Sequence, residues 1–95
     1  MPNVPANRFD FKHITAAGTI VVATKPAVLH TVNINKGWTG DITIYEGTAS
    51  PYAGTVAVID TASVASLQFD TEHQVGLTAV VSGTPGDATV SYVEI

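Results

Sequence analysis

Apolar and polar residues alternate along the chain between Ala27 and Gly47, in two runs separated by a short loop. Alternation with a period of two is typical of a β-strand that is buried on one face. In the second run, Ile42 and Ile44 share one face, with Thr43 and Tyr45 opposite. In the first run, one predicted face carries four side chains: Val28, His30, Val32 and Ile34. The sequence therefore predicts two strands joined as a hairpin by residues 36–40, with the other strands added around it.

The same alternation, interrupted by glycine and proline, predicts six further strands. The residues Gly83 to Asp87 form the strongest turn signal, because proline presets φ and glycine accepts positive φ. Consecutive hairpins would make the sheets antiparallel. We expect these further strands at residues 8–15, 19–24, 55–59, 67–70, 74–82 and 88–95. About eight short strands indicate an all-β, two-sheet sandwich of jelly-roll or immunoglobulin-like topology, with a small closed barrel as the alternative.

Composition supports this fold class. The 95 residues are the length of one domain and include 13 Val, 13 Thr and 7 Ile, whose branched side chains fit a pleated sheet. We expect one sandwich domain at residues 9–95, preceded by an extended arm at residues 1–8. The chain has no cysteine, so disulfides do not stabilise it.

Charge narrows the range of partners. Only 13% of the residues are charged, about half the usual share, and four basic side chains give a net charge of −4. Such a chain cannot neutralise many phosphates, so we expect no nucleic-acid partner. The apolar runs are too short to span a bilayer, and no signal-peptide core is visible, so we expect synthesis in the cytoplasm and no membrane partner. The sparse surface charge favours self-association or cover by another protein.

Catalytic and metal-binding patterns are weak. His13 and His30 fall in predicted strands, where a hydrogen-bonded histidine is the ordinary role. The sequence Asp70–His73 groups two carboxylates and an imidazole in a predicted polar corner, but the spacing of a calcium loop is absent. No serine lies in a G-x-S-x-G motif, and no glycine-rich phosphate loop is present. We therefore expect no enzymatic activity, no metal and no cofactor.

Trp38 is the only tryptophan, and it lies in a loop between two glycines. Tryptophan is enriched among residues that anchor protein interfaces, so Trp38 is a candidate for binding a partner. The alternative is that Trp38 folds back as a lid on its own sandwich.

The first nine residues form the second candidate region. Two prolines favour an extended conformation, and the following aromatic–charged alternation suits an edge strand. An extended segment beside an edge strand can add to a neighbour's sheet through main-chain hydrogen bonds. The predicted partner-binding residues are Pro2, Asn3, Val4, Pro5, Arg8, Phe9 and Trp38.

A family resemblance runs through residues 17–95. It is carried by strand and turn residues: Val21–Val22, Leu29–His30, Ile34–Asn35, Gly40 with Ile42–Tyr45, Gly76–Leu77, Val80–Gly83 and Asp87–Val90. This pattern resembles small structural proteins of tailed bacteriophages and prophages. The resemblance implies a virion protein, and the expected function is that of a capsid decoration (cement) protein on the outer surface of the head. Its expected partners are the major capsid protein and further copies of itself, as a trimer. The alternative is a glycan-binding or structural module of a head fibre or tail.

Overall fold

The computed structural model describes residues 9–95, which form eight β-strands and no helix, and hence no helix able to cross a membrane. The predicted arm at residues 1–8 lies outside the described residues. The strands are β1 (Asp10–Ile14), β2 (Gly18–Ala23), β3 (Ala27–Lys36), β4 (Asp41–Glu46), β5 (Gly54–Asp60), β6 (Ala65–His73), β7 (Leu77–Val81) and β8 (Asp87–Glu94).

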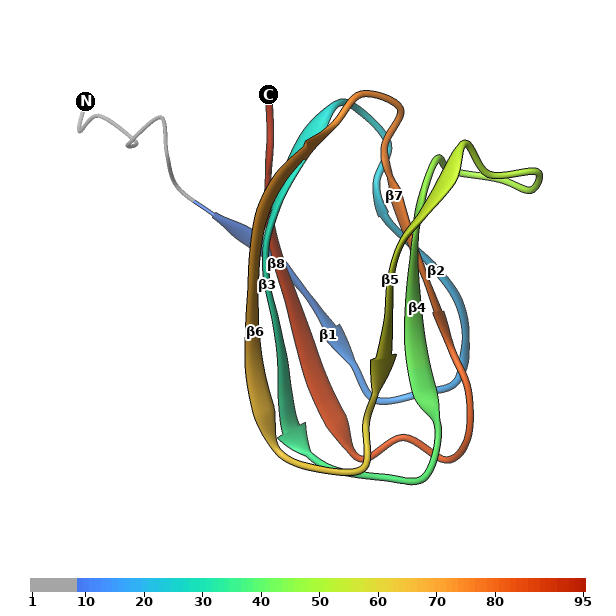
Figure 1. Ribbon diagram of the computed structural model, residues 1–95, viewed down its shortest axis with the longest axis vertical. Coiled ribbons are helices and arrows are strands. Elements are labelled where there is room, and N and C mark those ends of the chain that lie inside the picture. The colour runs from blue at the N-terminus through green and yellow to red at the C-terminus, as the bar shows by residue number, and fades with distance from the viewer. Residues whose placement is uncertain (1–8) are drawn as a thin grey trace.

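The strands form two four-stranded sheets that pack face to face (Figure 1). The strand order is β1-β8-β3-β6 in one sheet, called sheet A below, and β2-β7-β4-β5 in the other, called sheet B. Every pair of neighbouring strands is antiparallel. This order is that of a jelly roll, in which the first half of the chain pairs with the second half. The predicted all-β sandwich is confirmed, and the jelly roll is the topology that it adopts.

The predicted hairpin between residues 27 and 47 is wrong. β3 belongs to sheet A and β4 to sheet B, so residues 37–40 cross from one sheet to the other. The hairpin partner of β4 is β5, with Ile42 opposite Ile59. Local alternation predicts a strand but does not say which strand pairs with it, and both strands already have other neighbours in their sheets.

A β-bulge at His30 changes the face assignment within β3. Leu29 pairs with Tyr92 and Thr31 with Ser91, so His30 is an extra residue against β8. Because one extra residue reverses the alternation, Leu29 points into the core together with Val32, against the sequence prediction. The predicted inward face holds from Val32 onward and fails before the bulge.

The core lies between the sheets. Its members are apolar and at most 8% exposed: Ile14, Val22, Ala23, Ala27, Leu29, Val32, Ile34, Trp38, Ile42, Ile44, Ile59, Leu77, Ala79, Val81, Ala88, Val90 and Tyr92. The predicted shared face of Ile42 and Ile44 is confirmed, since both are fully buried. The predicted polar corner at Asp70–His73 is instead the last part of β6.

Trp38 belongs to this core and is only 8% exposed. Its Nε1–H donates to the carbonyl oxygen of Ser82 at 3.0 Å, and its backbone N–H donates to that of Thr61 at 2.9 Å. The Thr61 hydroxyl donates in return to the Trp38 carbonyl at 3.0 Å. The indole is buried and its Nε1–H is bonded within the fold, and the backbone of Trp38 is bonded to Thr61, so Trp38 does not present an exposed anchor. The structure corrects the partner-binding assignment of Trp38 and agrees with the lid alternative.

We predict that Trp38→Ala destabilises the isolated domain by about 3 kcal/mol, because it removes a large buried side chain and leaves a cavity. Denaturant unfolding followed by circular dichroism measures this loss. The matched control is Val75→Ala, which truncates a half-exposed side chain outside the strands and is expected to change stability by less than about 0.5 kcal/mol. An unchanged unfolding midpoint for Trp38→Ala would contradict the core assignment.

Candidate interaction surfaces

The free edge of sheet A carries two exposed phenylalanines. β1 is one of the two outer strands of this sheet and pairs only with β8. Phe9, immediately before β1, is 42% exposed, and Phe11 within β1 is 67% exposed. Of the residues predicted to bind a partner, Phe9 is therefore at the surface, whereas Pro2, Asn3, Val4, Pro5 and Arg8 lie outside the described residues.

Phe9 is held in place by the bulge in β3. Its ring stacks on the imidazole of His30, with ring centroids 4.1 Å apart and planes inclined by 9°. His30 Nδ1 is hydrogen-bonded to Asp70 Oδ1, and Gln68 Nε2 donates to the other oxygen of the same carboxylate. The bond from His30, followed by that from Gln68, lowers the pKa of Asp70. The bulge thus places a hydrogen-bonded cluster with a carboxylate against the ring of Phe9.

A second polar cluster lies at the opposite end of the outer face of sheet A. His13 Nε2 and Asp87 Oδ2 are 2.8 Å apart, and Asn35 Nδ2 donates to Asp87 Oδ1 at 2.9 Å. The amide of Asn35, and then His13, lower the pKa of Asp87. Thr89 accepts a further bond from Asn35 at 3.2 Å. These contacts join β1, β3 and β8 through polar side chains on the outer face of sheet A.

The third histidine connects the two sheets. His73 ends β6 in sheet A, and its Nδ1 lies 3.1 Å from Glu46 Oε1 at the end of β4 in sheet B. The bond from His73 is the main cause of the lowered pKa of Glu46, and the backbone N–H of Gln74 adds to it at 3.0 Å. His73 Nε2 lies 2.8 Å from the hydroxyl of Thr71.

This Thr71–His73–Glu46 chain has the order of a nucleophile, a base and an orienting acid. None of these three residues lines either of the two hollows described below, where a substrate could bind. What the geometry supplies directly is a bridge between the sheets. Each of the three histidines has its own carboxylate, and within residues 9–95 no group of three or more His, Asp or Glu is close enough to hold a metal ion.

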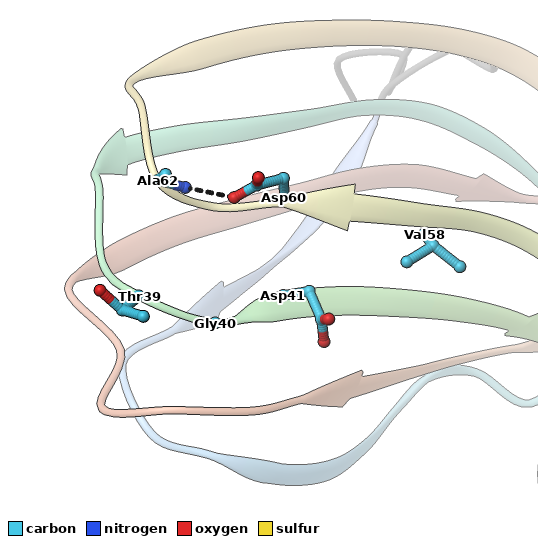
Figure 2. Close-up of a pocket in the computed structure, with 6 residues that line it drawn as sticks. All are labelled: Thr39, Gly40, Asp41, Val58, Asp60 and Ala62. Atoms are coloured by element: carbon cyan, nitrogen blue, oxygen red, sulfur yellow. Dashed lines mark hydrogen bonds between the residues drawn. The ribbon is translucent and has the colours of Figure 1, made fainter.

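Two open hollows lie beside β5, one of the two outer strands of sheet B. The first, of about 460 Å³, is lined by Thr39, Gly40, Asp41, Val58, Asp60 and Ala62 (Figure 2). Asp41 and Asp60 are directly opposite each other on β4 and β5, yet their carboxylates turn apart. Asp60 accepts the backbone N–H of Ala62 at 2.9 Å, and Asp41 accepts the hydroxyl of Ser82 at 2.9 Å. Both carboxylates are therefore used within the fold.

The second hollow, of about 480 Å³, is an apolar groove between β5 and β6, the outer strands of the two sheets on this side. Its apolar lining comes from Ala57, Val58, Ile59, Ala62, Ala65, Leu67 and Phe69. No pattern in the sequence predicted this groove. An available signal was the uncharged, β-branched run Thr55–Ile59, but only the topology makes it an outer strand.

Comparison of the chain with protein-family models, with curated proteins and with solved structures yields no match.

We predict that Glu46→Gln destabilises the domain at neutral pH by on the order of 1 kcal/mol, since it weakens a charge-assisted bond. The folded-state pKa of Glu46 lies below its ordinary value of 4.5. The contribution is therefore complete above about pH 4.5 and is lost as the pH falls through the lowered pKa. Urea unfolding of the parent protein and of Glu46→Gln from about pH 7 to about pH 3 measures this effect, since their free energies of unfolding should converge as the pH falls.

The control for that series is Glu72→Gln. Glu72 is exposed and accepts a bond from Gln74 Nε2, so the same change of charge should cost less. A stability difference between Glu46→Gln and the parent that stays constant down to about pH 3 would contradict the role of the carboxylate.

Proposed function

We propose that this chain is a structural protein of a bacteriophage virion, a decoration protein that binds the outer surface of the head. The observation that carries the proposal is the exposed pair Phe9 and Phe11 at the free edge of sheet A, next to the N-terminal segment. Exposed aromatic side chains at an unpaired strand edge favour docking to another protein. The resemblance in the strand and turn residues supports a virion partner, the major capsid protein.

The proposed contact has two parts. β1 has unpaired main-chain groups on its outer side, which can accept a strand from the capsid or add to a capsid sheet. Phe11 supplies apolar area, and Phe9 is already held against His30, so little conformational entropy is lost on binding. Residues 1–8 extend the contact. Many modest contacts of this kind, one for each copy, together stabilise a head against the pressure of its DNA.

The second candidate is a glycan-binding module of a head fibre or tail. The outer face of sheet A favours it, because Phe11 lies opposite Ser91 of β8, which in turn lies opposite Thr31 of β3, so hydrogen-bonding side chains lie in line with the exposed ring. Copy number separates the two functions: hundreds of copies in each purified particle support decoration, and a few copies support a fibre. A stained gel of virions from the phage or prophage that encodes the chain measures it.

We predict that Phe11→Ser lowers occupancy on those particles several-fold while the melting temperature of the free protein changes little, because Phe11 is mostly exposed. Occupancy is measured by adding purified protein to particles that lack it. Val75→Ser removes a comparable exposed apolar side chain away from β1 and is expected to bind normally. Equal occupancy by the two variants would overturn the docking edge.

We also predict that deletion of residues 1–7 leaves the β-sheet circular dichroism spectrum intact and lowers occupancy several-fold, since the segment precedes the first strand. The same occupancy assay is used. Full occupancy by the truncated protein would restrict the contact to β1 and its phenylalanines.

A further inference from the structure

β5 is an outer strand with little to prevent further pairing. It pairs only with β4, and its run from Thr55 to Ile59 has no charge and no proline. Val58 is 67% exposed on the outer face of sheet B. Natural outer strands usually carry lysine, proline or a bulge that blocks pairing with a second chain, and β5 has a bulge at Val56 but neither lysine nor proline in the run that follows it. The free edge of β5 therefore has the properties of a strand that pairs with something.

The surface next to this edge is apolar as well. The groove of about 480 Å³ runs beside β5 and is lined on its far side by Leu67 and Phe69 of β6. Val64, in the loop that joins the two strands, is 71% exposed. A strand added to β5 would extend sheet B over the groove and cover these side chains.

We propose that the added strand is β5 of a second copy, paired antiparallel about a two-fold axis at Val58. Residues directly opposite each other in an antiparallel pair have their side chains on the same face of the sheet, whereas consecutive residues have them on opposite faces. Two identical strands related by a two-fold axis can therefore pair only if one residue lies on the axis, opposite itself. The bulge at Val56, where the register with β4 shifts, leaves Ala57 to Asp60 as the straight part of the strand. Pairing about Val58 places Val58 opposite itself and Ala57 opposite Ile59.

The charges of β5 allow this arrangement. The only charged residue of the strand is Asp60 at its end. In the proposed register each Asp60 lies opposite Val56 of the other copy, and the two Asp60 residues are separated by about 13 Å along the strands. That distance exceeds the Debye length of about 8 Å at physiological ionic strength, so their repulsion is largely screened.

The other outer strands are less suited to pairing with themselves. β1 would place Lys12, its middle residue, opposite Lys12 of the second copy. β6 carries Asp70 and Glu72, and its pairing with β3 is irregular near Asp70. β2 is irregular between Val21 and Ala23. β5 combines an exposed apolar residue, a neutral centre and an adjoining apolar groove.

Self-association, which accompanies the proposed function, would then use the free edge of β5 and have two-fold symmetry, where the sequence led us to expect a trimer. β1 and β5 lie on opposite sides of the sandwich, since β1 and β6 are the two outer strands of sheet A and the groove joins β5 to β6. A pair joined through β5 therefore leaves both β1 edges free. Such a pair can connect two capsid subunits. This connection rests on the proposed function, whereas the pairing through β5 does not.

The test is sedimentation equilibrium of the full chain up to several hundred micromolar, because an interface this small is expected to be weak. The parent protein should reach twice the 9.9 kDa mass of one chain. Val58→Lys should reduce the association constant at least tenfold, by placing two like charges opposite each other on the axis. Val75→Lys makes the same change at an exposed valine outside the strands and should associate like the parent.

Folding of each variant is checked by its melting temperature at low concentration, where Val58→Lys should match the parent because Val58 is exposed. A second measurement locates the contact: amide NMR signals of Ala57–Asp60 should shift as the parent protein is concentrated, and those of β1 should not. A parent protein that stays monomeric or forms trimers, a Val58→Lys variant that associates normally, or shifts confined to β1 would overturn the inference. Association through β5 in a protein that virions do not contain would instead overturn the proposed function and leave this contact standing.

Discussion

Main-chain pairing between the two halves of the chain is the constraint on which the rest of the structure depends. β4 pairs with β5, β3 with β6, β2 with β7 and β1 with β8, as if one long hairpin had been rolled up. Two further pairs, β3 with β8 and β4 with β7, join the turns of the roll into sheets. Nearly all of these pairs are distant in sequence, so much chain entropy is lost before the core forms, and slow folding is expected.

The roll also has to cross repeatedly between sheets, and polar side chains stabilise these crossings at both ends. At one end, Trp38, Thr61 and Ser82 are joined by side-chain and backbone bonds. At the other end, His73 reaches Glu46, and the buried hydroxyl of Thr78 donates to the carbonyl oxygen of Gly47 at 2.7 Å. Backbone groups that leave the ladder at a crossing would otherwise be buried without partners. A fully apolar core could not supply these bonds.

These features explain which parts of the fold could be predicted from the sequence. Alternation at Ile42–Ile44 identified a strand and its buried face, because a strand with one face in the core must alternate. The pairing of β4 could not be predicted, because the alternating patterns of β3 and β5, the strands before and after it, fit equally well as its hairpin partner. The reversal before Val32 depends on one extra residue, His30, whose effect is visible only against β8.

The candidate surfaces, too, could be predicted from the sequence only in part. The exposure of Phe9 agrees with the edge strand inferred from its aromatic–charged neighbours. Trp38 could not be assigned, because glycines flank both exposed loops and tight crossings. Val58 has the same apolar character as the buried Ile59 next to it, and it is exposed because it lies on the outer face of β5 while Ile59 lies on the inner face.

The central position of β8 has a consequence for protein synthesis. β8 lies between β1 and β3, so sheet A has no continuous ladder until residues 87–94 are in place. On a ribosome, β1 and β3 emerge long before the strand that joins them, and they must wait without their shared neighbour. A nascent chain stopped before β8 therefore has no closed sandwich to present to other molecules. Sheet A therefore closes only after the last of its four strands along the chain has been synthesised.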